Sequence, residues 1–573
     1  MKPYRKLLTG IALALPLIFW WYVLLRYSIN VPWFDDFEVF PDFLRQWLAA
    51  ESLGQHWQLL IKANNEHRMV FAKLLTAGYF SFTQSLNFTF LHVAGAFFTM
   101  GTFWILWRVF QESAFPAWYF IPAAFLLFQL QPSMIFLWAI CGLQHQPVVF
   151  FVCLSMYLLA RNRLGWAILA AVCASFAMSS GLFVWTGGVA ILLLRSQYRY
   201  LAAWVGTALV SGVLYFRGME TQGNEESISF FMQHPHLSFL GFFAFLGGLF
   251  DFAPERSIEV RTAVPILVAI VLMTGVLAWL LGLVLPWIRN NFGKNLQVPG
   301  WLSKLGTSSA QRPVLRDFTL GLLFFLLANA AIIGFLRPRF GFMVMVVSNY
   351  KIYPALFLIT CYLAWLNGTY SGTRQKKGVQ AALVLSMGIW AMSMLHYLPG
   401  IIERRKNLLV SAYNQEHHAF GLGFQPGSEA AQYTDDLMKD VTQRGIYTYP
   451  REFDGYFNAM LELSTPYAQP DDIQTEVLED IILIQEPRGW NTSLADDDGT
   501  YVFLRNQENF YPFKMNQNLY MGRNPFIRYE EGMKIEIPRA AIAPGTYEVG
   551  FFKIRDGSTQ GGIVRSLEIT RPN

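Results

Sequence analysis

Two neighbouring carboxylates stand out near the start of the chain. Asp35 and Asp36 follow an apolar run over residues 7–27, in the segment Val31-Pro-Trp-Phe-Asp-Asp-Phe-Glu38. Burial among aromatic side chains and mutual repulsion both raise a carboxyl pKa. A carboxylate in such a setting suits general-base catalysis or metal binding. The alternative is a pair of solvated loop acids.

A cationic stretch follows farther along the same loop. Asn64-Asn65-Glu66-His67-Arg68 stands at the start of a predicted helix. Positive side chains at a helix N-terminus favour an anion site, because the backbone N–H groups and the helix dipole add to their charge. An Arg fork also matches phosphate geometry. A basic cluster that contacts lipid headgroups is the alternative.

Two later segments carry further polar side chains beside apolar runs. Arg337 and Arg339 flank Pro338 and precede Tyr350 and Lys351, whereas Gln144, His145 and Gln146 stand together at a predicted helix start. The arginines either bind phosphate or anchor a helix end at the interface. The glutamines either bind sugar hydroxyls or satisfy a helix terminus.

The composition indicates how these residues are positioned. Of the 573 residues 54% are hydrophobic and 14% are charged, whereas soluble domains average about 25% charged residues. A bilayer core requires about 20 mostly apolar residues per helix. We therefore predict an α-helical polytopic membrane bundle with eleven spans. They are residues 7–27, 88–110, 117–130, 147–160, 164–178, 182–194, 201–216, 263–288, 318–335, 352–366 and 379–397.

The basic loops predict the orientation of this bundle. Lys and Arg cluster before residue 7 and within 161–163, 195–199, 289–316 and 374–377. The positive-inside rule places these loops and the N-terminus in the cytoplasm. The pattern holds if the apolar segment 236–252 is re-entrant and does not cross. Short basic loops of this kind do not indicate a nucleic-acid partner.

Two domains follow from the step in charge density after residue 397. Residues 1–397 form the predicted transmembrane module, with a first periplasmic loop at 28–87 that contains helices at 42–51, 55–63 and 67–82. Residues 398–573 form a predicted periplasmic domain, helical over 398–445. Short alternating runs at 499–504, 519–521, 533–537 and 545–554 predict a β-sandwich of jelly-roll type over 446–573.

The arrangement resembles the GT-C glycosyltransferases. Its acid pair follows the first span directly, and the Asn-Glu-His-Arg stretch, residues 138–146, the turn at 179–181 and residues 337–350 look like those of bacterial members. The resemblance implies an inverting enzyme of the bacterial inner membrane. Such an enzyme moves a sugar from a polyprenyl-phosphate carrier to an envelope glycan, lipid or protein acceptor on the periplasmic face.

The resemblance and the chemistry together assign roles to residues. The general base maps to Asp36 or Asp35, with Asp36 favoured. A phosphate leaving group needs positive charge and no general acid. The expected donor-phosphate ligands are His67, Arg68, Arg337, Arg339 and Lys351, and the expected substrate contacts are Glu66, Gln144, Gln146 and Tyr350. A divalent metal, Mg²⁺ or Mn²⁺, stays open; its ligands would be Asp35, Asp36 and Glu38.

Two other classes of membrane protein are alternatives to this interpretation. An O-antigen polymerase or ligase also has exterior Arg and His, but it places its key loop late in the chain and lacks the early acid pair. A transporter of lipid-linked glycans should show repeat symmetry or charged residues inside its spans. The sequence shows no evident repeat, and the interiors of its predicted spans are nearly free of Asp, Glu, Lys and Arg.

Overall fold

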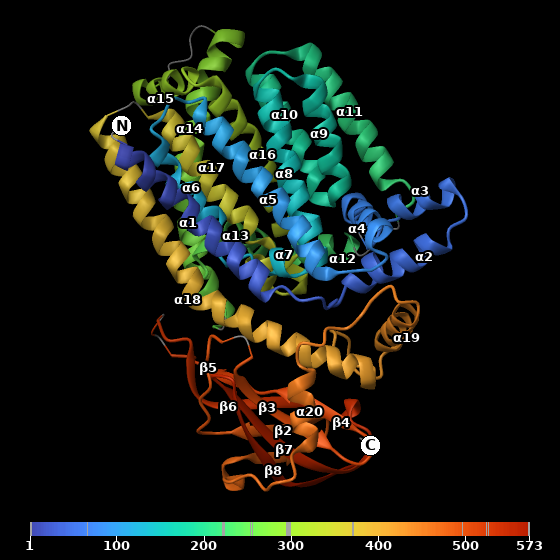
Figure 1. Cartoon of the computed structure of the whole chain (residues 1–573). Coiled ribbons are helices and arrows are strands. Elements are labelled where there is room, and N and C mark those ends of the chain that lie inside the picture. The colour runs from blue at the N-terminus through green and yellow to red at the C-terminus, as the bar shows by residue number, and fades with distance from the viewer. Residues whose placement is uncertain are drawn as a thin grey trace. The chain divides into compact units, whose positions relative to one another are not determined.

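The computed structural model describes residues 3–65, 67–219, 224–252, 254, 256–293, 299–369, 372–495, 497–522, 524 and 526–570. The chain is mostly helical, with an antiparallel β region near its C-terminus (Figure 1). It divides into two compact units. The first combines Met1–Leu24, Gly54–Leu75 and Leu91–Met394, and the second combines Leu25–Leu53, Thr76–Phe90 and Leu395–Asn573.

Seven helices among the described residues are long and apolar enough to cross a membrane. Leu7, Ile11 and Ile18 of the first helix are each more than half exposed, and an apolar face of this kind is typical of a surface that lipid or another protein covers. The seven are α1 (Pro3–Tyr27), α5 (Phe88–Gln111), α8 (Ala139–Ala160), α11 (Tyr198–Phe216), α14 (Ile258–Phe292), α16 (Pro313–Leu336) and α18 (Thr373–His418).

Shorter helices lie wholly or partly in the first unit; α4 begins there and ends in the second. Glycines allow some of them to approach closely: a Cβ added to Gly187 would lie 2.4 Å from the carbonyl oxygen of Gly321, where α10 packs on α16. These helices are α3 (Leu53–Ile61), α4 (Val70–Thr83), α6 (Ile121–Leu127), α7 (Ser133–Leu137), α9 (Leu164–Ala177), α10 (Val184–Leu194), α12 (Asn224–Gln233), α13 (Pro235–Leu246), α15 (Gly300–Ala310) and α17 (Ile352–Gly368).

The segment predicted to be re-entrant forms one short helix. Helix α13 has 12 residues, which corresponds to a length of about 18 Å, well below the roughly 30 Å of a bilayer core. A 3₁₀ turn, η4 (Gly248–Phe250), follows it. Whether the segment enters a membrane stays a prediction.

The end of the apolar part differs from the prediction. Residues 379–397 were expected to form one helix and residues 404–418 another, but α18 is continuous over 46 residues and passes through Pro399. A proline inside a helix removes one backbone hydrogen bond without necessarily ending the helix. The polar last turns are held by ion pairs, in which Glu403 accepts from Lys406 at 2.9 Å and from Lys514 at 2.7 Å.

Among its described residues the second unit also holds the short helices α2, α19 and α20 in full. Helix α2 (Phe43–Ala49) follows a π-helical turn, η1 (Glu38–Asp42), which contacts helix α19 (Glu429–Gln443). Helix α19 begins where the Ser428 hydroxyl accepts from the Ala431 N–H at 3.2 Å, an ordinary N-cap. Helix α20 (Asp454–Glu462) leads into the β region.

Within the described residues, eight strands form two antiparallel sheets around one core. Their orders are β1-β2-β6-β5 and β4-β3-β7-β8, and buried residues of both sheets, among them Ile484, Val502, Ile537 and Phe551, belong to a single hydrophobic cluster. The strands are β1 (Gln474–Val477), β2 (Ile481–Glu486), β3 (Gly499–Arg505), β4 (Phe510–Lys514), β5 (Asn516–Leu519), β6 (Tyr529–Pro538), β7 (Gly545–Arg555) and β8 (Ser558–Ile569).

The strand order is not that of a jelly roll, so this part of the prediction was wrong. Each successive pair, β1-β2, β3-β4, β5-β6 and β7-β8, is a hairpin within one sheet. Short connections pair neighbouring strands locally; Asp556 and Gly557, for example, both with positive φ, close the β7-β8 turn. Alternation of apolar residues predicts a buried face, but it carries no information on strand order.

Replacing Ile484 with Ala tests the shared core of the two sheets. The side chain is fully buried, and deleting such a side chain costs about 2–5 kcal/mol. We expect faster amide hydrogen exchange in β3 and β7 of the opposite sheet, measured on the full chain. Val477→Ala, at a position that is 38% exposed, is the control. Equal exchange in the two variants would show that the sheets do not depend on one core.

Candidate functional site

The acid pair lies on a tight turn in the second unit. The Asp36 N–H donates to the Trp33 carbonyl oxygen at 3.2 Å, and the Trp33 N–H donates to Asp36 Oδ2 at 3.0 Å. Asp36 is 1% exposed, whereas Asp35 is open to solvent. The two carboxylates therefore differ in role: the Asp36 carboxylate closes the turn, and that of Asp35 can reach other molecules.

The protein around Asp35 nevertheless changes the pKa of its carboxyl. The protein around it displaces enough water to raise the pKa of its carboxyl above the ordinary value by desolvation. A carboxylate with a raised pKa is a stronger base than a fully solvated one. An exposed group of this kind at the surface of a fixed turn has the properties expected of a general base.

Phe34 adopts a backbone conformation that bulky residues rarely occupy. Its φ is +48°, and a conformation of this kind costs on the order of 1–3 kcal/mol and persists only where its surroundings hold it. The Phe34 N–H donates to the carbonyl oxygen of Leu422 at 3.2 Å, and its ring lies 5.4 Å from that of Phe424.

Gly423 completes this clamp. Its φ is +116°, and a Cβ there would lie 2.5 Å from Phe34 Cδ2. Gly423 is therefore required both by its own backbone conformation and by the close approach of the Phe34 ring. Segment 422–424 of the C-terminal region thus fixes a turn that precedes it by almost 400 residues.

The residues before the turn are fixed in the same unit. Asn30 accepts from the Phe88 N–H at 2.8 Å and donates to the Thr448 carbonyl oxygen at 3.2 Å, while the Tyr447 hydroxyl donates to the Asn30 carbonyl oxygen at 2.7 Å. The Arg404 guanidinium lies over the Trp33 ring, 5.1 Å from its centroid. Three separate chain segments therefore position the acid turn.

A second polar group lies in the first unit. Tyr353 on α17 brings together two side chains: its hydroxyl lies 2.8 Å from Nδ1 of His145 on α8 and 3.3 Å from the hydroxyl of Ser180. The neighbouring Ser179 hydroxyl lies 3.0 Å from Nδ1 of His67. The 3₁₀ turn η3 (Ser179–Phe183) thus joins residues from four parts of the sequence.

The turn η3 is fixed by Gly181. A Cβ at this position would lie 1.8 Å from the Ala174 carbonyl oxygen, so only glycine fits. Tyr350 stands beside the same group, with its ring 5.9 Å from that of His145 and 5.8 Å from that of Phe245. Of the predicted residues, the structure therefore brings His67 and Tyr350 close to His145.

Lys351 lies next to this group but is held by an ion-pair network. Its Nζ donates to the Gly248 carbonyl oxygen at 2.7 Å and to Asp251 Oδ2 at 3.0 Å, and Arg261 contacts the same carboxylate at 2.9 Å. Lys351 and Asp251 are each 1% exposed. Removal of one partner of such a buried pair typically costs about 3–5 kcal/mol.

Arg68, the cation of the Asn-Glu-His-Arg stretch, also donates hydrogen bonds to backbone carbonyl oxygens. Arg68, 5% exposed, donates from Nε to the Tyr215 carbonyl oxygen at 2.6 Å and from its two terminal nitrogens to the carbonyl oxygens of Ile61 and Arg217. These bonds join the ends of α3 and α11. Lys73 caps carbonyls of the same loop, Leu59 and Lys62, and its burial lowers its pKa to about 7.

The two predicted arginines of the late loop lie on the short turn η5 (Pro338–Phe340) and at its N-cap. Both guanidinium groups lie over the Phe340 ring, and Arg339 pairs with Glu226 at 2.8 Å. Glu226 is 80% exposed on its side chain. The Arg339 side chain is 14% exposed, so the pair is half in the protein and half in solvent, where screening weakens it.

The two glutamines are buried in the first turns of α8. Gln144 Nε2 contacts the Met69 sulfur at 3.3 Å, and Gln146 Nε2 donates to the Ile135 carbonyl oxygen at 3.0 Å. Among the described residues, Oε1 of Gln146 has no hydrogen-bond partner. An orphaned buried acceptor of this kind is a place where a water or a ligand hydroxyl can donate.

Two further predictions concern Glu66 and the metal ligands. Glu66 lies outside the described residues. Among the residues that the structure does describe, no three His, Cys, Asp or Glu side chains gather as metal ligands, so Asp35, Asp36 and Glu38 do not form such a set.

Several residues of the site escaped the sequence analysis. Asp251 and Arg261 stand 100 and 90 positions before Lys351, and no spacing rule links them. Tyr353 belongs to an apolar run. The pattern Gly421-Leu-Gly423-Phe was the one signal for the clamp, because paired glycines often mark backbone that approaches another group closely.

Replacing Gly423 with Ala should release the acid turn. The added Cβ collides with the Phe34 ring, so the amides of Asp36 and Phe37, which donate to Trp33 and Phe34, should exchange faster. Gly427→Ala is the matched control, since Gly427 also has a positive φ but has open space around its Cβ. Exchange mass spectrometry of peptides over residues 31–40 makes the comparison. Equal protection in both variants would contradict the clamp.

The chain was compared with known proteins by family, by sequence and by structure. No family model, no curated protein and no solved structure matches it.

Proposed function

We propose that this chain is a GT-C-type glycosyltransferase of the bacterial inner membrane. In this proposal the apolar helices cross the membrane, the N-terminus is cytoplasmic and the β-sandwich is periplasmic. The enzyme transfers a sugar from a polyprenyl-phosphate carrier to a glycan, lipid or protein acceptor of the envelope. The observation that carries the proposal is Asp35: an exposed carboxylate of raised pKa on a strained, clamped turn directly after the first apolar helix.

The proposed reaction is a displacement at the anomeric carbon. Asp35 takes the proton of an acceptor hydroxyl, and the hydroxyl oxygen forms a bond to the anomeric carbon while the bond from that carbon to the phosphate oxygen breaks. Attack from the face opposite the carrier inverts the configuration. The polyprenyl phosphate leaves as a weakly basic anion, so its departure needs stabilising positive charge and no proton.

The geometry favours Asp35 over Asp36 as the base, although the sequence favoured Asp36. Asp36 is buried and accepts the Trp33 N–H. Its carboxylate thereby acts as a positioning group for its neighbour. An acceptor hydroxyl must come within about 3 Å of the base, and the exposed Asp35 side chain permits that approach.

Among the predicted phosphate ligands, Arg339 is the strongest candidate. Arg68 donates to three backbone carbonyls, and Lys351 is paired with the buried Asp251. Arg339 has a mostly exposed partner, Glu226, that a phosphate can displace. His67, Gln146 and Tyr350 are proposed to contact the substrate, the first two through hydrogen bonds.

Substitution of the two acids separates their roles. Asp35→Asn should lower the rate of sugar transfer by about 100- to 10,000-fold, the usual range for a lost general base. Asp36→Asn keeps an oxygen that can accept the Trp33 N–H and should retain most activity. Transfer from a panel of labelled polyprenyl-phosphate hexoses and pentoses, using protein in lipid nanodiscs, measures both. Full activity of Asp35→Asn would end the assignment.

The raised pKa of Asp35 also predicts the pH dependence. The base works only when ionised, so the rate falls as the pH drops through the pKa of Asp35. Because burial raises that pKa, the acid limb of kcat/KM should lie above pH 3.8, the ordinary value for Asp. The limb should be absent from the residual activity of Asp35→Asn.

Arg339 and Arg68 should respond differently to loss of charge. Arg339→Gln should lower the transfer rate about 100- to 1000-fold without unfolding, as expected when one electrostatic contact to a leaving group is lost. Arg68→Gln should instead lower thermal stability, because three carbonyl partners lose their donors. Size-exclusion chromatography after heating monitors folding. An active Arg339→Gln variant would assign the phosphate to other cations.

A further inference from the structure

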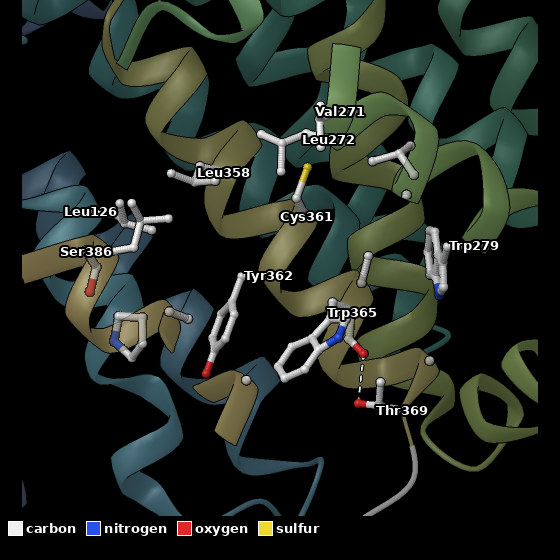
Figure 2. A pocket seen from close by; sticks show the side chains of 18 of the residues that line it. Leu126, Val271, Leu272, Trp279, Leu358, Cys361, Tyr362, Trp365, Thr369 and Ser386 are labelled. Atoms are coloured by element: carbon white, nitrogen blue, oxygen red, sulfur yellow. Dashed lines mark hydrogen bonds between the residues drawn. The ribbon is translucent and has the colours of Figure 1, made fainter. Parts of the chain in front are cut away.

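An apolar cavity of about 470 Å³ lies among five helices of the first unit, α6, α14, α15, α17 and α18. Figure 2 shows Leu272, Leu358, Cys361, Tyr362 and Trp365 around it. The volume is within the roughly 300–1,000 Å³ of pockets that bind small molecules. None of the predicted catalytic or phosphate-binding residues lines it.

Three polar side chains around the cavity have hydrogen-bond partners in the protein. The Tyr362 hydroxyl donates to the Tyr119 carbonyl oxygen at 2.6 Å, and the Thr369 hydroxyl donates to the Trp365 carbonyl oxygen at 2.9 Å, as the dashed line in Figure 2 shows. Trp279 Nε1 donates to the Ser309 hydroxyl at 3.1 Å. The cavity therefore offers a hydrocarbon surface, and an apolar cavity does not hold water stably.

Exposed cations stand next to lining residues of this cavity in the sequence. Lys304 is exposed and adjoins Leu305, and Arg374 and Lys376 are exposed within one helical turn of Gly378; Leu305 and Gly378 both line the cavity. Arg312 donates to the carbonyl oxygen of Asn367 at 3.3 Å, next to the lining residue Gly368. The sequence has no Asp or Glu over 299–316 or 366–385. The positive-inside rule assigns these cations to the cytoplasm.

We propose that this cavity binds an acyl chain of an anionic diacyl phospholipid, with its phosphate at the cations formed by Lys304, Arg374 and Lys376. An acyl chain matches the hydrocarbon lining, and a negative headgroup matches these cations. The inference rests on the proposed membrane location and not on sugar transfer. This site differs from the proposed catalytic one in its lining, because none of the residues that line the cavity is Asp, Glu or His.

Gly275 allows the cavity to be filled without a collision. It lines the cavity, and a Cβ added to it meets nothing within 4 Å. Gly275→Phe should therefore occupy the space of the acyl chain. Gly206→Phe on α11 is the matched control, because Gly206 also has open space around its Cβ but does not line the cavity.

Native mass spectrometry of the full chain with added phosphatidylglycerol or phosphatidylcholine of identical chains measures the binding. The unsubstituted protein and Gly206→Phe should retain phosphatidylglycerol in preference to phosphatidylcholine, and Gly275→Phe should lose that retention. Substituting Gln at Lys304, Arg374 and Lys376 should weaken the preference by about fivefold per cation. Arg199→Gln, in another basic loop, should leave it unchanged. Size-exclusion chromatography verifies folding of each variant.

Other outcomes overturn the proposal. Unchanged phosphatidylglycerol binding by Gly275→Phe, or equal retention of both lipids by the unsubstituted protein, removes the site. A dimer that Gly275→Phe disrupts without a change in lipid binding assigns the cavity to a second copy of the chain. Displacement of phosphatidylglycerol by polyprenyl phosphate, together with loss of transfer in Gly275→Phe, assigns it to the carrier. Because the readout is lipid retention, the outcome does not depend on the fate of Asp35 in the transfer assay.

Discussion

The constraint on which the site depends is the backbone of Phe34. Its positive φ directs the chain so that Asp35 faces outward while Asp36 turns inward to the Trp33 N–H. Phenylalanine does not prefer that conformation. It is held by the hydrogen bond from the Phe34 N–H to the Leu422 carbonyl oxygen and by the room for the Phe34 ring beside Gly423. Contacts with distant residues hold the strained turn in one conformation, which a loop without such contacts would not keep. This order is what would make one carboxylate, among several in the loop, a base of defined position.

Most of the buried cations in the first unit contact backbone carbonyls or buried carboxylates of the protein itself. Arg68 and Lys73 donate to carbonyls at the ends of short helices, where the backbone has no partners of its own. Lys351 shares Asp251 with Arg261. Such charges replace backbone or solvent partners that an apolar environment lacks. A phosphate site therefore has to draw on cations with exchangeable partners, of which Arg339 is the clearest case.

The sequence predicted an apolar helical region and a β region, because hydrophobic length and alternation are local properties. Of the eleven expected spans, seven correspond to described helices that are long and apolar enough to cross a membrane, and the other four, at 117–130, 164–178, 182–194 and 352–366, hold shorter helices. It did not predict that α18 continues through Pro399, nor the hairpin order of the sheets, since both depend on contacts beyond the local pattern. Their position after the first apolar run identified the two acids in the sequence, but it did not predict that one would be buried and the other exposed. Only the geometry distinguishes an aspartate that accepts the Trp33 N–H from its exposed neighbour. Likewise, nothing local linked Lys351 to Asp251, 100 residues earlier.

The clamp on Phe34 has a consequence for biosynthesis. The turn is translated near the start of the chain, whereas Leu422 and Gly423 follow the last apolar run. A growing polypeptide thus lacks the residues that organise Asp35 until almost 400 further residues have been made. In the proposed topology the segment must also be exported before it can reach the turn. On the proposed function the protein would then be inactive throughout insertion, and a product truncated before residue 422 would contain the seven long apolar helices of the described residues and still lack an ordered Asp35 turn.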